Sequence, residues 1–313
     1  MNIVVTGSLG YDYIMDFSGC FSDRMMKKKI HQISLSFLVD TLTKQMGGIA
    51  GNIGYSLKLL GVEPIILSSA GNDFNLYEKH LQKNNISTKY IAKKSDVVSG
   101  TYFVMTDKED NQIGGYYRGA LPYNRELSIL SIKETIDLVV ISADDPIAMK
   151  KHVDECIKLH IPYMYDPAFQ IGDFSKGELH KAISHAALCI GNDYEIALME
   201  KKLEVSHTTL CSLVPILITT IGAKGSVIET GKKTYTIKPA KAKNSSDPTG
   251  AGDAYRAGFL VGYVRGLDLQ TCGQMGSVAS VYTVETYGTQ THTYTIAQFS
   301  KRYKENYQGR FCI

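Results

Sequence analysis

Short runs of β-branched and aliphatic residues alternate with stretches of helical periodicity along most of the chain. The runs expected to form strands are residues 3–6, 65–67, 138–142, 188–190 and 216–219. The stretches expected to form helices are 52–60, 76–82 and 147–159, followed by two helices near the C-terminus. Apolar strands that alternate with helices are typical of a mostly parallel sheet covered by helices on both faces. The pattern therefore predicts an α/β fold.

Two segments break this alternation. Residues 11–17 and residues 99–117 contain strand-like runs with no helix between them, and the second segment turns back on itself through residues 107–111. Such a pattern is typical of a strand and a β-hairpin in a separate small sheet. We therefore expect one large domain and a small β lid. The predicted large domain comprises residues 1–12, 41–95 and 119–313, and the predicted lid comprises residues 13–40 and 96–118.

The composition is that of an ordinary globular protein. Of the 313 residues, 44% are hydrophobic and 21% are charged, and the net charge is +3. The densest basic cluster, residues 27–29, is interpreted as a solvated turn, so nucleic acid is not an expected partner. No apolar run has the length of a membrane span, and residues 1–7 are typical of a first strand rather than a signal peptide. These features predict a cytoplasmic protein with no membrane partner.

Cysteine and histidine spacing gives no sign of a metal site held by these residues. The six cysteines include no C-x-x-C pair, and the eight histidines include no H-E-x-x-H. Several cysteines stand in apolar runs, where a small buried thiol is the usual interpretation. We therefore expect free cysteines, a reducing compartment and no zinc site.

A turn of small residues that leads into a helix is the strongest local signal. It reads Asp247-Pro-Thr-Gly250-Ala251-Gly252-Asp253, and small and apolar residues follow it at helical spacing. Backbone N–H groups at such a helix start can bind a phosphate, or the charge that develops as a phosphoryl group is transferred. Asp253 would lie in the first helical turn, where a carboxylate could deprotonate an attacking hydroxyl. The turn from Gly250 to Asp253 is therefore a candidate anion hole with a catalytic base.

A helix-capping aspartate beside a flexible turn is the alternative interpretation of this motif alone. Two other phosphate-binding motifs are excluded. The chain contains no G-x-x-x-x-G-K-[ST], and Tyr255 stands where a dinucleotide fingerprint requires a glycine. The choice between a phosphate-binding turn and a simple helix cap therefore depends on other segments of the sequence.

Residues 247–259 resemble the C-terminal signature D-[ST]-x-G-A-G-D-x-F-x-x-G-F of the ribokinase-like (PfkB) carbohydrate and nucleoside kinases. The N-terminal signature of that family resembles Gly47-Gly48-Ile-Ala-Gly51-Asn52. The resemblance implies a three-layer αβα sandwich with a mostly parallel central sheet and a small β lid. It also implies an ATP-dependent phosphotransferase in which Asp253 is the base.

Two further segments resemble the nucleotide side of this family. Asn192-Asp-Tyr-Glu195 is similar to the family's N-x-x-E element, which implies that Asn192 and Glu195 help to hold Mg²⁺, largely through water. Thr219-Thr220-Ile-Gly222-Ala-Lys-Gly225 is similar to its nucleotide-binding turn, which implies ATP contacts from Thr220, Gly222 and Gly225 together with Asn192. Taken alone, the first segment would be a helix N-cap and the second an ordinary strand exit. ATP and Mg²⁺ are the implied cofactors, and the resemblance leaves K⁺ open.

Within the family, the chain resembles adenosine kinases of the mycobacterial type in residues 31–40, in the opening Thr6-Gly-Ser8 with Asp12, and in residues 253–259. The resemblance implies a nucleoside site in which Asp12 binds the ribose hydroxyls and two lid tyrosines stack on the base. The implied substrate-binding residues are Ser8, Asp12, Ser36, Gly48, Asn52, Tyr102, Tyr116 and Gln170.

The implied reaction is phosphorylation of the ribose 5′-hydroxyl of adenosine to AMP, a purine-salvage reaction. Three alternatives stay open: another nucleoside such as inosine, a free sugar such as ribose or fructose, and a binding protein without catalysis. In this family the lid can contribute edge strands to a dimer, so a homodimer through the lid is a further expectation.

Overall fold

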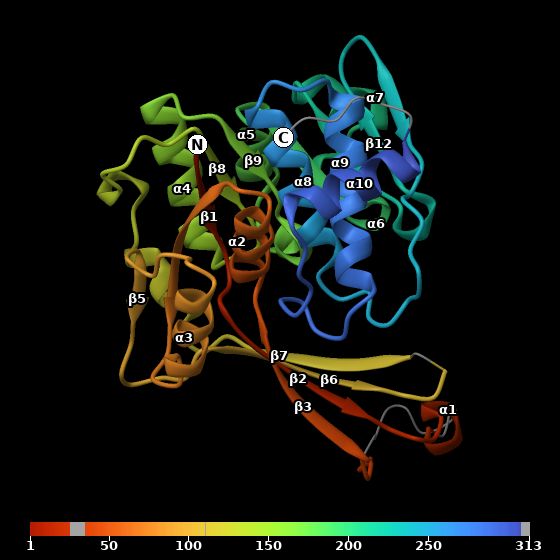
Figure 1. The fold of residues 1–313 in the computed structure, drawn as a ribbon. Helices are drawn as coiled ribbons and strands as arrows, with labels where there is room; N and C mark the ends of the chain where they lie inside the picture. The colour runs from red at the N-terminus through yellow and green to blue at the C-terminus, as the bar shows by residue number, and fades with distance from the viewer. Residues whose placement is uncertain (26–34, 110, 308–313) are drawn as a thin grey trace.

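The computed structural model describes residues 1–25, 35–109 and 111–307. Its main feature is a nine-stranded sheet with the order β13-β12-β11-β10-β9-β8-β1-β4-β5 (Figure 1). The seven strands from β11 to β5 in this order are parallel, and β12 and β13 are antiparallel at one edge. The strands are β1 (Asn2–Thr6), β4 (Glu63–Ala70), β5 (Ile91–Lys93), β8 (Leu138–Ile141), β9 (Tyr163–Tyr165), β10 (Leu188–Asn192), β11 (Leu217–Thr220), β12 (Ser226–Glu229) and β13 (Thr234–Ile237).

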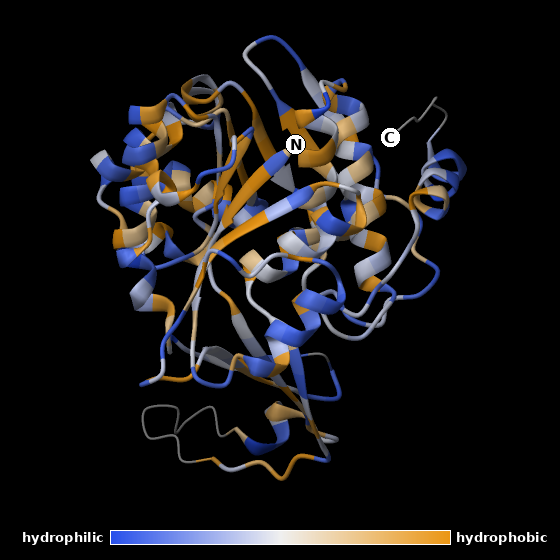
Figure 2. Cartoon of the chain, turned by 60° about the vertical axis from the view of Figure 1, so that its left-hand side comes forward, coloured by the Kyte–Doolittle hydropathy of each residue, from blue (hydrophilic) through white to orange (hydrophobic). Residues whose placement is uncertain are grey.

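Helices cover both faces of this sheet, and each face has its own core. Neighbouring strand residues such as Val4 and Val5 are both fully buried but belong to different cores, because successive side chains point to opposite faces. Figure 2 shows the hydrophobic strands between the two helical layers. The core that contains Val5 includes α2 (Ile49–Leu59), α3 (Asn75–Lys83), α8 (Ala251–Val264), α9 (Leu269–Val284) and α10 (Ile296–Asn306). The core that contains Val4 includes α4 (Pro146–Leu159), α5 (Lys176–Ser184), α6 (Asp193–Leu203) and α7 (His207–Leu213). The predicted three-layer αβα fold is confirmed.

A second, four-stranded sheet projects from the large one with the order β3-β2-β6-β7 (Figure 1). Its strands are β2 (Gly10–Asp16), β3 (Thr41–Gly47), β6 (Gly100–Thr106) and β7 (Gln112–Tyr117), and the short α1 (Phe21–Arg24) lies at its far end. The sequence placed residues 41–47 in the large domain, whereas they pair with β2 in the small sheet. Polar residues on both faces of β3 hid its strand character, because only strict alternation of apolar and polar residues reveals a half-buried strand.

The C-terminal part holds three helices rather than the predicted two. α10 begins at a capping box, in which Thr295 and Gln298 bond each other's backbone N–H. Short 3₁₀ segments complete the described chain, at η2 (Leu121–Glu126), η3 (Ile129–Ser131), η4 (Ala168–Asp173) and η5 (Gly222–Lys224).

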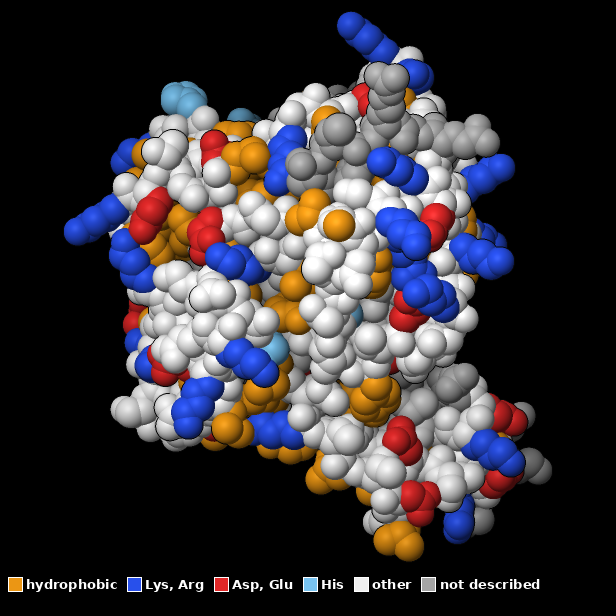
Figure 3. Space-filling model, in the orientation of Figure 1, with side chains coloured by type: hydrophobic (Ala, Val, Ile, Leu, Met, Phe, Trp, Pro, Cys, Tyr) orange, Lys and Arg blue, Asp and Glu red, His pale blue; other side chains and the backbone are white. Residues whose placement is uncertain are grey.

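The surface carries charges of both signs. Figure 3 shows Lys and Arg side chains beside Asp and Glu side chains on the large and the small part of the molecule. No helix among the described residues is long and apolar enough to cross a membrane.

Candidate active site

The start of α8 has the geometry of an anion-binding turn. Gly250 has φ +78°, and a Cβ at this position would lie 2.9 Å from Thr289 Cγ2, so only glycine fits. The N–H of Ala251 bonds Pro248 O at 3.2 Å, and the N–H of Ala254 bonds Gly250 O at 3.0 Å. For the N–H groups of Gly252 and Asp253, no acceptor is recorded in the described chain. These two amides stand at the positive end of the helix dipole and are free to bind an anion.

Asp247 holds this turn in place. Its Oδ1 accepts a hydrogen bond from the N–H of Thr249 at 2.9 Å, and its Oδ2 accepts one from the N–H of Gly288 at 3.0 Å. The first aspartate of the signature therefore clamps the turn to the segment after α9.

Asp253 is joined to the start of α2 by a hydrogen bond. Asn52 Nδ2 donates to Asp253 Oδ2 at 2.8 Å. The Asn52 oxygen accepts from Thr289 Oγ1 at 2.8 Å and from Gln290 Nε2 at 2.9 Å. The single Thr289 hydroxyl proton is shared between Asn52 and the Met46 carbonyl. The Gln290 amide is therefore the donor that fixes the Asn52 oxygen and directs the Asn52 NH₂ group at Asp253. The two glycine-containing motifs, about 200 residues apart in sequence, thus meet at one carboxylate.

Burial raises the pKa of Asp253 to about 6, while Arg256 and the hydrogen bond from Asn52 oppose this shift. Arg256 is buried and forms an ion pair with Asp166. Its Nη2 lies 2.8 Å from Asp166 Oδ1, and its Nε lies 2.5 Å from Asp166 Oδ2. A Cβ on Gly252 would lie 2.8 Å from Arg256 Nη1, so the guanidinium lies directly against the anion-binding turn. It adds a fixed positive charge beside the free amides.

Asp12 approaches the same space from the small sheet. It is 8% exposed, and a Cβ on Gly47 would lie 2.3 Å from Asp12 Oδ2, so the carboxylate fits only because residue 47 is glycine. Burial, followed by the charges of Asp253 and Asp247, raises its pKa to about 7. The two predicted aspartates are therefore close enough to influence each other's ionisation.

Ser8 and Gly48 join β1 to the start of α2. The Ser8 hydroxyl accepts a hydrogen bond from the N–H of Ile49 at 3.2 Å. Gly48 has φ +86°, and a Cβ there would lie 2.6 Å from Ser8 O. The Gly-Gly pair thus allows two close approaches, one by the Asp12 carboxylate and one by the Ser8 backbone.

The lid tyrosines share a face of the small sheet with Asp12. In the strand register Asp12 pairs with Tyr102, and Tyr102 pairs with Tyr116. Paired residues on neighbouring strands point to the same face, so both rings lie on the side of Asp12. A Cβ on Gly114 would meet the Tyr102 hydroxyl at 2.5 Å, and one on Gly100 would meet that of Tyr116 at 2.4 Å. The two glycines make room for rings that lie flat across the sheet.

A cavity of about 450 Å³ opens beside Tyr116 and includes Gln170. Gln170 Nε2 donates to the Asp144 carbonyl, and its buried Oε1 has no hydrogen-bond partner among the described residues. At the wall of the cavity Asp145 binds both Arg118, at 2.6 Å, and Arg125, at 2.8 Å. A buried acceptor without a donor is costly unless a ligand supplies one.

The residues predicted to bind nucleotide lie at the carboxyl ends of β10 and β11. Asn192 caps α6 in a capping box with Glu195, and in the strand register it stands beside Thr220. Gly222 and Gly225 have φ +52° and +97°, and a Cβ on Gly225 would lie 2.0 Å from Ile237 O. The carboxyl ends of parallel strands are where ligands bind in open α/β sheets.

Glu195 connects these residues electrostatically to the anion-binding turn. Burial raises the pKa of its carboxyl, Asp166 raises it further, and Arg256 lowers it. The same Arg256 acts on Asp253, so one buried cation lies between the two groups of predicted residues.

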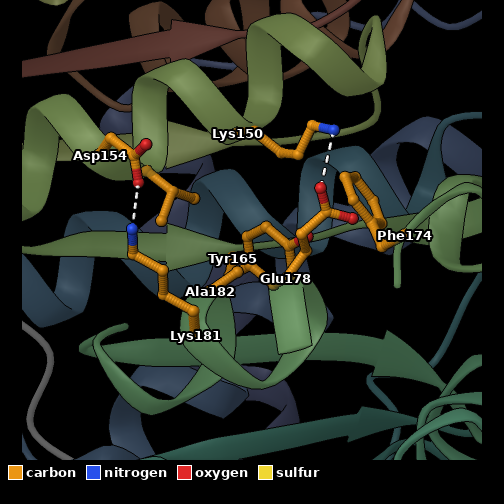
Figure 4. Close-up of a pocket in the computed structure, with 8 residues that line it drawn as sticks. Lys150, Asp154, Tyr165, Phe174, Glu178, Lys181 and Ala182 are labelled. Carbon is orange, nitrogen blue, oxygen red and sulfur yellow. Dashed lines mark hydrogen bonds and ion pairs between the residues drawn. The ribbon is translucent and has the colours of Figure 1, made fainter. Parts of the chain in front are cut away.

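Ser36 is not brought together with the other predicted residues. It lines a hollow of about 290 Å³ beside Phe17 and Phe37, at the far part of the small sheet. A further small cavity, of about 150 Å³, lies between α4 and α5 (Figure 4). It is bordered by the ion pairs Lys150–Glu178 and Lys181–Asp154 and contains none of the predicted residues.

The family model for pfkB carbohydrate kinases matches residues 3–296. The chain belongs to this family. Its relatives include the nucleoside kinase of Methanocaldococcus jannaschii, which is 31% identical over 292 residues that cover 93% of this chain and 92% of that protein. The solved structure of Burkholderia thailandensis nucleoside kinase in complex with inosine is 31% identical, covers 98% and 99% of the two chains, and has a TM-score of 0.91. The solved structure of the M. jannaschii enzyme is 30% identical, with coverage of 97% and 98% and a TM-score of 0.87.

Membership of the pfkB family makes the protein a kinase. Sequence reasoning did not assign a role in the site of this pfkB kinase to Arg256, Asp166, Thr289 or Gln290. Arg256 lies one helical turn after Asp253, and that spacing was a signal available in the sequence, since residues three apart share a helix face. Nothing in the sequence pattern indicates that residues 289–290 reach Asn52.

Proposed function

We propose that this pfkB kinase transfers the γ-phosphoryl group of ATP to the ribose 5′-hydroxyl of adenosine. The observation that carries the proposal is the meeting of Asn52 and Asp253 at 2.8 Å beside the free amides of α8, with the Asp12 carboxylate facing the same space. A base, an anion site and a diol-binding carboxylate are what a sugar-hydroxyl kinase requires.

Support for a nucleoside over a free sugar comes from the small sheet and the neighbouring cavity. Tyr102 and Tyr116 offer ring faces on which a purine would stack, and the cavity next to Tyr116 has room for a base. The unpaired Oε1 of Gln170 would accept a hydrogen bond from a base N–H. The B. thailandensis relative in complex with inosine supports the same class of substrate.

In the proposed reaction Asp12 accepts hydrogen bonds from the ribose hydroxyls, and Asn52 holds Asp253 at the 5′-hydroxyl. Asp253 then accepts the proton of that hydroxyl as its oxygen attacks the γ-phosphorus in line with the leaving ADP. The amides of Gly252 and Asp253 and the guanidinium of Arg256 stabilise the charge on the transferred group. The small sheet would close over the nucleoside and exclude water.

On the donor side Thr220, Gly222 and Gly225 would contact ATP, as would Asn192. Bound Mg²⁺ would neutralise charge on the phosphates. Glu195 accepts a hydrogen bond from the N–H of Asn192 at 2.8 Å through one oxygen, and its carboxylate would help to hold the ion through water, as the family resemblance implies. Another solved structure of the B. thailandensis relative is in complex with ADP-inosine.

The outer face of the small sheet supports a homodimer. Leu42 and Ile113 lie in one cross-strand row through Met15 and Met105, and Phe103 lies in the next row. Leu42 is 62% exposed, Ile113 is 43% exposed and Phe103 is 45% exposed. An exposed apolar sheet face is typical of a protein contact, and a second copy of the chain would cover it.

A panel of acceptors with the purified protein tests the proposed function. With ATP and Mg²⁺ we expect AMP from adenosine, and a kcat/KM for adenosine at least tenfold above that for ribose or fructose, which is a difference of about 1.4 kcal/mol. A kcat/KM for inosine tenfold above that for adenosine would show that the substrate is a nucleoside other than adenosine. A tenfold preference for a free sugar, or nucleoside binding without ADP release, would overturn the proposal.

A further inference from the structure

A cluster of histidine, cysteine and glutamate lies on the surface of α6, α7 and β12. His207 and Cys211 stand four residues apart on α7 and therefore share a helix face, with Cys211 Sγ 3.5 Å from His207 Nε2. Glu229, at the end of β12, places Oε2 2.9 Å from the same nitrogen. The three ligand atoms lie within 4.8 Å of one another.

The spacing suits a tetrahedral metal ion. With a Zn–S distance of about 2.3 Å and a Zn–N distance of about 2.05 Å, the sulfur and nitrogen of a tetrahedral site lie roughly 3.5 Å apart. The corresponding N–O separation is roughly 3.3 Å, so Glu229 would withdraw from its present 2.9 Å by a few tenths of an ångström. Nitrogen, thiolate and carboxylate are ligands that zinc accepts.

A second carboxylate already orients the histidine. Glu200, on α6, lies 2.6 Å from His207 Nδ1, the ring nitrogen that faces away from Cys211. Such a carboxylate holds the Nδ1 proton, as in carboxylate–histidine–zinc triads, and a metal ion would replace the proton that Nε2 now shares with Glu229. His207 is partly exposed, so water can complete the coordination.

We propose that His207, Cys211 and Glu229 bind one zinc ion that fastens α7 to β12, with Glu200 as the partner of His207. The site is separate from the active site. Glu229 pairs with Leu217 at the start of β11, whereas Thr220 lies at the carboxyl end of that strand. Figure 1 shows α7 and β12 at the end of the molecule away from the small sheet. No zinc spacing in the sequence reveals this site, because Glu229 on β12 lies 18 residues beyond Cys211 and on a different element from the two α7 ligands.

Metal-free full-length protein, titrated with ZnCl₂ against a chromophoric chelator, tests the proposal. We expect one zinc per chain, and Cys211→Ser should weaken binding at least ~10-fold. Glu200→Gln should weaken it by about 10-fold. Cys20→Ser, which changes another partly buried cysteine, is the matched control and should bind like the wild type.

Cobalt(II) and thermal unfolding give independent readouts. Cobalt should produce a thiolate charge-transfer band in the wild type and in Cys20→Ser but not in Cys211→Ser. Zinc should raise the Tm of the wild type and not that of Cys211→Ser, whose kinase activity with Mg²⁺ should stay within twofold and so show that it is folded. Absence of stoichiometric zinc binding, equal zinc affinity in Cys211→Ser, or a cobalt complex without the thiolate band would each overturn the site.

Discussion

Three carboxylates converge at the start of α8, and each is used differently. Asp247 accepts hydrogen bonds from two backbone N–H groups, and Asp253 accepts one from Asn52. Asp12 is buried, and its carboxylate has no hydrogen-bond partner among the described residues. Burial raises the pKa of Asp12 to about 7 and that of Asp253 to about 6. At the scale of single residues, burial therefore disfavours the ionised forms of Asp12 and Asp253 in the unliganded protein.

Replacement of Asp12 by Asn should stabilise the unliganded protein at neutral pH. The folded-state pKa of Asp12, about 7, lies above its ordinary value of 3.8, so the folded protein binds a proton that the unfolded chain has released. Ionisation of Asp12 therefore lowers stability as the pH rises through about 7. We expect Asp12→Asn to raise the free energy of unfolding by roughly 4 kcal/mol at pH 8, and the gain to disappear below about pH 4.

Thermal unfolding of both proteins across this pH range measures the effect. Asp16→Asn, on the same strand but exposed, should show no such pH-dependent gain. A wild type that is more stable than Asp12→Asn at pH 8 would contradict the charge repulsion inferred here.

The pH dependence of kcat/KM should show an acid limb between about pH 6 and 7, because Asp12 and Asp253 must both be ionised. Asn52→Ala removes a hydrogen bond that lowers the pKa of Asp253, so the lower step of this limb, near pH 6, should move to higher pH. Tyr77→Phe removes a hydroxyl that bonds Gln290 and Gly47 O but neither Asn52 nor Asp253, and should leave the limb in place. A limb that stays fixed in Asn52→Ala would show that Asp253 does not set it.

The sequence predicted the two motifs but not all of the residues that contact them. Asp253 and Asn52, from the two signatures, are hydrogen-bonded to each other, and Asp12 lies near enough to Asp253 that the charge of Asp253 raises the pKa of Asp12. Arg256–Asp166 and the Thr289–Gln290 contact to Asn52 are long-range pairings, which no local pattern encodes. Ser36 was assigned by resemblance alone, and the structure places it elsewhere on the small sheet.

At the scale of elements, glycines decide where α2 and α8 can begin. Gly48→Ala should cost about 2 kcal/mol or more in stability and lower activity strongly, because its Cβ would press on the Ser8 backbone at a positive φ. Gly177→Ala is the matched control, because it lies in α5 with nothing within 4 Å of its Cβ and should be neutral or stabilising by up to about 1 kcal/mol. Denaturant unfolding of both variants gives the comparison. Equal stability of Gly48→Ala and Gly177→Ala would contradict the inferred clash between a Cβ at residue 48 and the Ser8 backbone.

The sequence predicted β1, β4, β8, β10 and β11 of the large sheet, but not the three- and four-residue strands β5, β9, β12 and β13. Buried parallel strands such as β1 and β8 are continuous apolar runs, and a helix such as α4 has a clear apolar stripe. β3 escaped detection because its residues gain their positions from pairing with β2 rather than from a pattern of their own.

At the scale of the whole molecule, we expect the small sheet to join two copies of the chain. Phe103→Glu places a charge on the exposed apolar face and should convert a dimer into a monomer in sedimentation or light scattering. Leu130→Glu changes a residue that is similarly exposed but lies outside the small sheet, and should leave the assembly unchanged. A wild-type protein that is monomeric at high concentration would refute the dimer and leave the active site untouched.

The central claim is that Asp253 is the base of a nucleoside kinase, and the variant Asp253→Asn tests it most directly. Asparagine keeps the size of the side chain but cannot accept the proton. We expect kcat to fall at least ~10²-fold, while calorimetry shows adenosine binding within a few-fold of the wild type. An Asp253→Asn protein with wild-type turnover would contradict the account.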